Sequence, residues 1–134
     1  HPSARYGRRL RLESVQNALD QARVAAANIC GKQVLYDSLP WFWSDQYSIK
    51  LQSVGLLLER ETVVLRGDPQ TAGDEGFCVF HLRGDVMIAA DCINRAKEFI
   101  ACKRLIAERL PVNLQALSDQ TFGVEAFERR EDVL

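Results

Sequence analysis

Two apolar runs separated by a short glycine turn are the feature that most restricts the fold of this chain. Phe77 to Leu82 and Val86 to Ile93 are rich in apolar and β-branched residues, and Arg83-Gly84-Asp85 lies between them. This pattern predicts two antiparallel strands joined as a hairpin, because glycine adopts the backbone conformations that a tight turn requires. We therefore expect an antiparallel sheet.

Further strands are expected before the hairpin. Thr62 to Leu65 is a short β-branched run that ends in a second Arg-Gly-Asp triplet, at residues 66–68. Earlier in the chain, apolar and polar residues alternate, which places Tyr47, Ile49 and Leu51 on one face of a half-buried strand. Both triplets stand where glycine suits a turn, so we interpret them as turns and not as adhesion motifs.

Helices are predicted on both sides of the strands. Residues 14–30 carry apolar residues at spacings of three and four, with Ser14 as the N-cap and Gly31 as the stop. Residues 95–110 repeat this spacing, and Pro111 ends it. The order of elements predicts an α+β fold: a small antiparallel sheet of about four or five strands, covered by a helix and preceded by another helix, with a C-terminal tail.

Charge and composition exclude several classes of function. The 17 Lys and Arg residues nearly balance the 18 Asp and Glu residues, so no broad basic surface is available for nucleic acid. We interpret the four arginines within residues 5–11 as an exposed charged edge and not as a phosphate site. No apolar run reaches the roughly 18 residues of a membrane helix, and no secretion signal is visible. We expect a cytoplasmic protein that binds neither nucleic acid nor membrane.

Independent chemistry finds little support in the sequence. The four cysteines form no CxxC pair, which argues against a metal site and a disulfide framework. Cys78 and His81 are three positions apart in a predicted strand, so their side chains diverge. The dinucleotide motif G-x-G-x-x-G and the P-loop are both absent. We expect no catalytic residue, no metal centre and no complete nucleotide site in this chain.

Three consecutive aromatic residues are the most unusual feature. Trp41, Phe42 and Trp43 follow Pro40, which stops any helix. In an extended segment the two indoles face one way and Phe42 faces the other. They either fill a core or an interdomain seam, or form a flat wall against a conjugated ligand or a partner protein. The residue pattern alone leaves both interpretations open.

The sequence around this aromatic run resembles a known family. Residues 40–46 (PWFWSDQ) and the following residues 47–52 resemble the carboxyl-terminal domain of bacterial NAD-linked ferredoxin reductases, such as the reductases that serve aromatic-ring dioxygenases. Similar stretches elsewhere are residues 11–18 (RLESVQNA), 66–68 (RGD), 77–82 (FCVFHL, for F-S-V-F-Y-L) and 90–95 (ADCINR, for V-D-x-x-N-R). Cys78, His81 and Ala96 depart from the family's usual Ser, Tyr and Pro.

The resemblance implies part of a three-domain flavoenzyme that passes electrons from NAD(P)H through FAD to a ferredoxin-type iron–sulfur protein or rubredoxin. Residues 1–34 would be the last strand and helix of the FAD domain, and residues 35–134 the carboxyl-terminal domain. The start at His1 instead of Met agrees with a piece cut from a longer protein. We expect the missing FAD and NAD domains to hold the cofactors, so that this chain alone keeps no FAD and is inactive.

The same resemblance implies which residues lie near the flavin. Glu13, Ser14 and Val15 would stand at a helix start that points at the ring, where backbone N–H groups favour negative charge. Trp41 and Trp43 would lie beside the ring and near the face that docks the acceptor. The resemblance identifies neither the ferredoxin nor the oxygenase, nor does it choose between NADH and NADPH.

Two alternatives remain from other classes. An interaction module would use the small-residue helix and exposed tryptophans to form a homodimer or domain-swapped dimer. A small stand-alone enzyme would use Asp45, His81 or Asp91 as acid or base, although each of these residues more commonly caps a turn or pairs with a cation.

Overall fold

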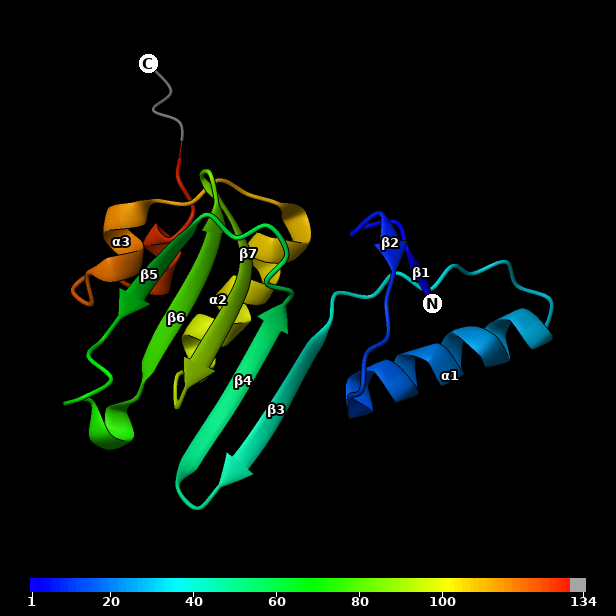
Figure 1. Cartoon of the computed structure of the whole chain (residues 1–134), viewed down its shortest axis with the longest axis horizontal. Helices are drawn as coiled ribbons and strands as arrows, with labels where there is room; N and C mark the ends of the chain where they lie inside the picture. Colours follow the sequence, from blue (N-terminus) through cyan, green and yellow to red (C-terminus); the bar gives the residue numbers. More distant parts are fainter. Residues whose placement is uncertain (131–134) are drawn as a thin grey trace. The chain divides into compact units, whose positions relative to one another are not determined.

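The computed structural model describes residues 1–130, which belong to two compact units (Figure 1). The first unit is His1–Phe42, and the second begins at Trp43. The expected boundary between residues 34 and 35 concerns the domains of a longer protein, and it stays a prediction. Within the described residues, no helix has the length and apolar character needed to cross a membrane.

The first unit contains one long helix and a small hairpin. Strands β1 (Pro2–Ser3) and β2 (Arg8–Arg9) pair antiparallel, and helix α1 spans Val15–Ile29. Ser14 caps the helix, because its side chain accepts a hydrogen bond of 3.1 Å from the backbone N–H of Asn17. Gly31, with φ of 91°, follows the last turn. Both predicted ends of this helix are thus confirmed.

The second unit is built on a five-stranded antiparallel sheet in the order β3-β4-β7-β6-β5. The predicted hairpin is confirmed, and Gly84 lies in its turn with φ of 61°. The fold class predicted from the sequence is therefore confirmed. The strands are β3 (Trp41–Gln46), β4 (Ile49–Gly55), β5 (Thr62–Arg66), β6 (Phe77–Arg83) and β7 (Val86–Ile93).

One part of the strand assignment was wrong. Tyr47 does not lie on the inner face of a strand but in the turn between β3 and β4, with φ of 56° and its side chain fully exposed. Ile49 is half exposed as well, and β4 becomes buried only at Ser53 and Val54. The turn end of the β3–β4 hairpin therefore lies outside the core. The aromatic run begins β3, the first strand of this hairpin.

Helix α2 (Ala96–Glu108) covers one face of the sheet (Figure 1). It forms from the predicted apolar spacing, and it ends at Arg109, which has a left-handed backbone conformation. It lies over β7 and β4, and its inward side chains and those of the sheet together exclude water. The main members of this core are Phe80, Leu82, Ala90, Phe99, Leu105 and Ile106.

Three cysteines lie inside this core without accessible surface: Cys78, Cys92 and Cys102. Cys78 stands opposite Cys92 in the β6–β7 pairing. Hydrogen bonding to Cys92 together with burial raises the pKa of the Cys78 thiol, and hydrogen bonding to Cys102 together with burial raises that of Cys92. These thiols therefore serve as small core side chains and not as nucleophiles.

Thiol titration checks this arrangement. Under native conditions an aromatic disulfide reagent is expected to modify exposed Cys30 rapidly and the three core thiols only after unfolding. A Cys30→Ser variant should show no rapid phase. Fast modification of a second thiol in the native protein would contradict the burial described above.

The chain after α2 packs on the second unit and does not hang free. Helix α3 (Leu114–Ser118) contacts β5, and the 3-10 turn η2 (Val124–Ala126) contacts α2. Phe127 is fully buried, with its ring edge-to-face on Phe80 at a centroid distance of 5.7 Å. The expected tail thus contains a short helix and completes the core. Residues 131–134 lie outside the described part of the chain.

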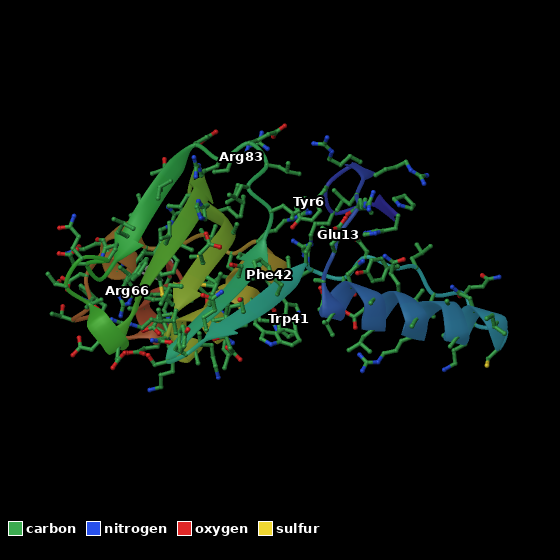
Figure 2. All side chains as sticks on the ribbon, turned by 60° about the horizontal axis from the view of Figure 1, so that its bottom comes forward. Tyr6, Glu13, Trp41, Phe42, Arg66 and Arg83 are labelled. Carbon is green, nitrogen blue, oxygen red and sulfur yellow. The ribbon has the colours of Figure 1, made fainter. Side chains whose placement is uncertain are left out.

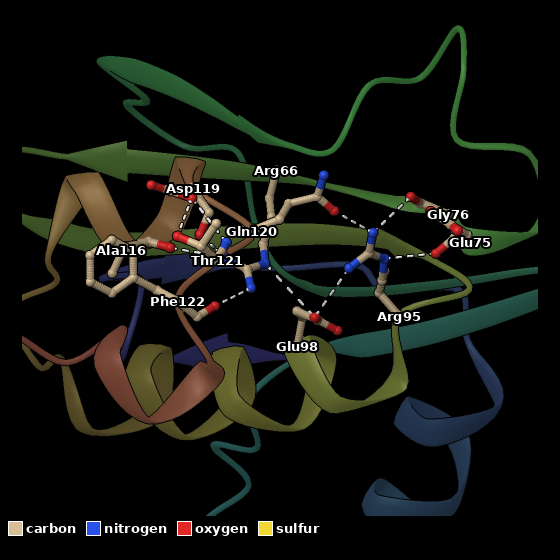
Figure 3. Close-up of polar contacts among 10 residues, drawn as sticks. All are labelled: Arg66, Glu75, Gly76, Arg95, Glu98, Ala116, Asp119, Gln120, Thr121 and Phe122. Atoms are coloured by element: carbon tan, nitrogen blue, oxygen red, sulfur yellow. Dashed lines mark hydrogen bonds and ion pairs between the residues drawn. The ribbon is translucent and has the colours of Figure 1, made fainter.

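Arg66 connects this C-terminal segment to the sheet (Figure 3). Arg66 is 3% exposed, and its guanidinium donates to three backbone carbonyl oxygens: those of Ala116 at 2.9 Å, Asp119 at 3.0 Å and Phe122 at 2.6 Å. Its Nε atom lies 3.8 Å from Glu98 Oε1, which is too long for a hydrogen bond, so this pair is ionic only. Arg95, 3.4 Å from the same carboxylate, completes the cluster.

Candidate functional site

The start of α1 is the first component of the predicted site. Ser14 uses its hydroxyl as the cap, whereas Glu13 is exposed and pairs with exposed Arg11 at 3.0 Å. Helical geometry leaves the N–H groups of Val15 and Gln16 without acceptors inside the helix. These groups and the positive end of the helix dipole favour a negatively charged group at this place.

Asn17, one of two buried amide side chains in the first turn of α1, holds the helix start. Asn17 Nδ2 donates to the carbonyl of Leu12 at 2.8 Å, and Asn17 Oδ1 accepts from Gln21 at 3.0 Å and from the hydroxyl of Tyr36 at 2.7 Å. Burial, assisted by the nearby carboxylate of Asp20, raises the pKa of Tyr36, so the phenol stays protonated as the donor. The residues before α1 and those after it are thus joined through one asparagine.

Gln16 brings Trp41 to the same place. Gln16 is only 5% exposed, and its Oε1 atom accepts a hydrogen bond from the backbone N–H of Trp41 at 3.3 Å. Its Nε2 atom donates to Asp20 Oδ2 at 2.5 Å. The helix start and the first tryptophan, 25 positions apart in the sequence, are therefore tied together within the first unit.

From Trp41, which bonds Gln16, the aromatic run continues along β3. Trp41 is half-buried, while Phe42 and Trp43 are 45% and 44% exposed. Trp41 and Phe42 leave opposite sides of the strand, as the strand period requires (Figure 2). Trp43 belongs to the second unit, so only Trp41 is placed with the helix start. The roles predicted for Glu13, Ser14, Val15, Trp41 and Trp43 beside a flavin stay predictions.

The apolar stripe of α1 has an unusual exposure. Val15, Leu19 and Ile29 are 58%, 51% and 86% exposed, whereas the helix buries the polar residues Gln16 and Asn17. Soluble helices normally bury the apolar face. We conclude that the face predicted to pack against another element has no cover within the first unit.

A second polar cluster lies on the sheet face opposite α2. Ser53 Oγ donates to Asp91 Oδ1 at 2.7 Å, and His81 Nε2 is 2.9 Å from Asp91 Oδ2. A guanidinium nitrogen of Arg60 lies 3.4 Å from His81 Nδ1, on the other side of the imidazole ring. Ser53 bonds the carboxylate and not the imidazole, so this row is no nucleophile–base pair.

This cluster weakens the stand-alone enzyme alternative. His81 and Asp91 are engaged with each other and with neighbouring strands, and Asp45 lies on the exposed part of β3. His81 points to the face opposite Cys78, as predicted from their spacing. Among the described residues, no three potential ligands from His, Cys, Asp and Glu gather into a metal site.

Comparison with known proteins identifies the second unit. Residues 41–127 match the protein family described as "Reductase C-terminal". The chain belongs to this family. The reductase C-terminal domain covers the five-stranded sheet, α2 and the packed segment through Phe127. The resemblance inferred from the aromatic run is therefore confirmed.

Named relatives are reductase components. The chain is 45% identical over 113 residues to the 5,5'-dehydrodivanillate O-demethylase ferredoxin reductase subunit of Sphingobium sp. (strain NBRC 103272 / SYK-6), covering 84% of this chain and 27% of the relative. It is also 45% identical over 116 residues to putidaredoxin reductase of Pseudomonas putida, covering 87% of this chain and 27% of the relative.

A solved structure shows the same fold. The crystal structure of the covalent putidaredoxin reductase–putidaredoxin complex matches with a TM-score of 0.81 and 43% identity, over 92% of this chain and 29% of that chain. The chain thus spans less than a third of the length of these relatives. It corresponds to the C-terminal part of ferredoxin reductases.

Gln16 and Asn17 are the site residues that sequence reasoning missed. A hydropathy pattern ignores polar residues inside a helix, and both were assigned to no face. The signal that could have found them is their place in the first turn after a strong N-cap, where amide side chains reach the chain segments beside the helix start.

Proposed function

We propose that this chain is the C-terminal part of a flavoprotein that transfers electrons from NAD(P)H through FAD to a ferredoxin-type iron–sulfur protein, or to rubredoxin, in an oxygenase system. The observation that carries the proposal is the family match together with 45% identity to reductase components over most of the chain. The chain's share of under a third of those relatives supports further domains for the cofactors.

The residues of the first unit fit the ring end of a flavin. The N–H groups at the start of α1 favour negative charge, which a reduced flavin carries near its pyrimidine edge. Such an effect is typically about 0.3–1 kcal/mol and reaches ~2 kcal/mol in partly buried sites, so it tunes a redox potential without performing the chemistry. The half-buried indole of Trp41 offers an apolar plane beside these groups.

The chain's own contribution is positioning and shielding. FAD, when bound, supplies the exchange between two-electron donation by NAD(P)H and one-electron delivery to the acceptor. Trp41 and Trp43 exclude water from the ring and present an apolar surface toward the acceptor protein. No acid, base or nucleophile from this chain is needed for that role. The missing domains would hold the diphosphates and the nicotinamide.

The direct test compares this chain with the full-length gene product. The isolated chain is expected to be colourless and unable to oxidise NADH or NADPH. The full-length protein is expected to be yellow and to reduce an artificial electron acceptor with one of these nucleotides. A colourless full-length protein without such activity would contradict the proposal.

Association between copies is the second candidate, and the exposed apolar stripe of α1 favours it. If this stripe drives dimerisation of the isolated chain, Leu19→Glu is expected to shift the chain toward monomer in light scattering at tens of micromolar. Ile100→Glu is the matched control, because Ile100 is also exposed but lies on α2. A strictly monomeric unsubstituted chain would remove this candidate.

A further inference from the structure

We propose that Gln16 is a positioning residue: it holds the backbone of Trp41 at the start of α1 and thereby orients the Trp41 indole beside the flavin. The inference rests on the proposed flavin function. It concerns a residue outside the aromatic run and outside the helix-start residues predicted from the sequence.

The hydrogen bonds of Gln16 fix the orientation of its side-chain amide. The side chain is buried, its oxygen accepts from the N–H of Trp41, and its nitrogen donates to the carboxylate of Asp20. A flipped amide would place its nitrogen against the Trp41 N–H and its oxygen against the Asp20 carboxylate, losing both hydrogen bonds. Asp20 therefore fixes the orientation in which Gln16 holds Trp41.

The position of Trp41 in the chain makes this contact important. Pro40, which is buried, has no backbone N–H, so Trp41 supplies the first backbone donor after the proline. β3 is an edge strand of the sheet, and edge strands leave a row of backbone groups outside the ladder. The hydrogen bond that the Trp41 N–H donates to Gln16 therefore supplies a constraint on Trp41 that comes from the helix and not from the sheet.

The first experiment measures hydrogen exchange of the Trp41 amide by NMR in this chain. Gln16→Met keeps the length of the side chain but removes the acceptor, and it is expected to raise the exchange rate of that amide about tenfold. Gln33→Met is the matched control, because Gln33 is exposed in the same unit, and it should leave the rate unchanged.

A double substitution tests whether the hydrogen bond to Trp41 can be restored with different side chains. Gln16→Glu combined with Asp20→Asn keeps the net charge and reverses the donor and acceptor between the two positions. The introduced carboxylate can still accept from the Trp41 N–H and also from the introduced amide. We expect the exchange rate to return to within about threefold of the original value. Unchanged exchange in Gln16→Met, or no rescue by the pair, would overturn the proposal.

The second experiment uses the full-length flavoprotein and its visible circular dichroism, which reports the surroundings of the flavin. Trp41→Phe should change the flavin bands, Gln16→Met should change them in the same direction, and Gln33→Met should not. If Trp41→Phe or Gln16→Met leaves the bands unchanged, the inference fails while the proposed function stands. If the full-length protein holds no flavin, the proposed function fails and this inference with it.

Discussion

Replacing Arg66 with methionine is expected to lower the free energy of unfolding by about 3–5 kcal/mol. The substitution removes the donor for three carbonyls between Ala116 and Phe122 and one of the two cations beside buried Glu98. It also removes the charge stacked 4.9 Å from the centre of the Phe127 ring. Because a domain of this size has roughly 5–15 kcal/mol in total, the variant should be close to unfolding.

The second Arg-Gly-Asp triplet provides the control. Arg83 is 57% exposed in its side chain and pairs with exposed Glu59, so Arg83→Met is expected to cost less than about 1 kcal/mol. Both variants are compared by urea unfolding monitored through tryptophan fluorescence. Equal losses in the two variants would show that Arg66 does not hold the C-terminal segment.

Replacing Gly76 with alanine is expected to have the second large effect. Gly76 has φ of 72°, and an added Cβ would lie 1.8 Å from the carbonyl oxygen of Ile93. With ψ of −173°, this backbone conformation is one that glycine alone adopts readily, and it costs about 1–3 kcal/mol for a residue with a side chain. Displacing the backbone of β7 adds about 1–3 kcal/mol. The change also disturbs Arg95, which donates to the carbonyls of Glu75 and Gly76 (Figure 3).

Gly84→Ala places a side chain at positive φ without crowding. Gly84 has a similar φ of 61°, but nothing lies within 4 Å of an added Cβ. This variant should lose only about 1–2 kcal/mol, the cost of a side chain at positive φ without crowding. Thermal and urea unfolding of the two variants check the difference. If Gly84→Ala were as damaging as Gly76→Ala, crowding at Ile93 would not explain the loss.

Much of the fold could be predicted because local signals agreed with the packing. Ser14 and Gly31 mark the ends of α1, and Gly84 marks the turn of the central hairpin. The turn at Tyr47 was missed because it contains neither glycine nor asparagine, although its backbone is left-handed. The alternation of the following residues then extended the predicted strand through it.

The role of Arg66 could not be read from its neighbours in the sequence. Arg66-Gly67-Asp68 looks like an exposed turn, and only the fold brings residues 116–122 over it, about 50 positions later. Glu98, which lies beside Arg66, is buried in the same region of the fold. Long-range polar contacts of this kind have no period, so hydropathy patterns do not detect them.

The candidate site was predictable only in part. Trp41 and Ser14 stand out by residue type, and the structure joins their segments within the first unit. Gln16 links the two segments through its hydrogen bond with Trp41, but a glutamine in a helix does not stand out in a sequence. Its role depends on which chain segment passes beside the first helical turn, and only the fold shows that this segment carries Trp41.

The exposure of α1 has a consequence for how mutational tolerance should be judged. In residues 1–42 no large apolar side chain is buried, while Val15 and Leu19 face outward and Gln16 and Asn17 face inward. Polar replacements of those outward residues would scarcely harm the isolated polypeptide, yet selection on the intact gene would remove them if a partner surface covers the helix. A mutational scan of this piece alone would therefore misjudge which of its residues evolution protects.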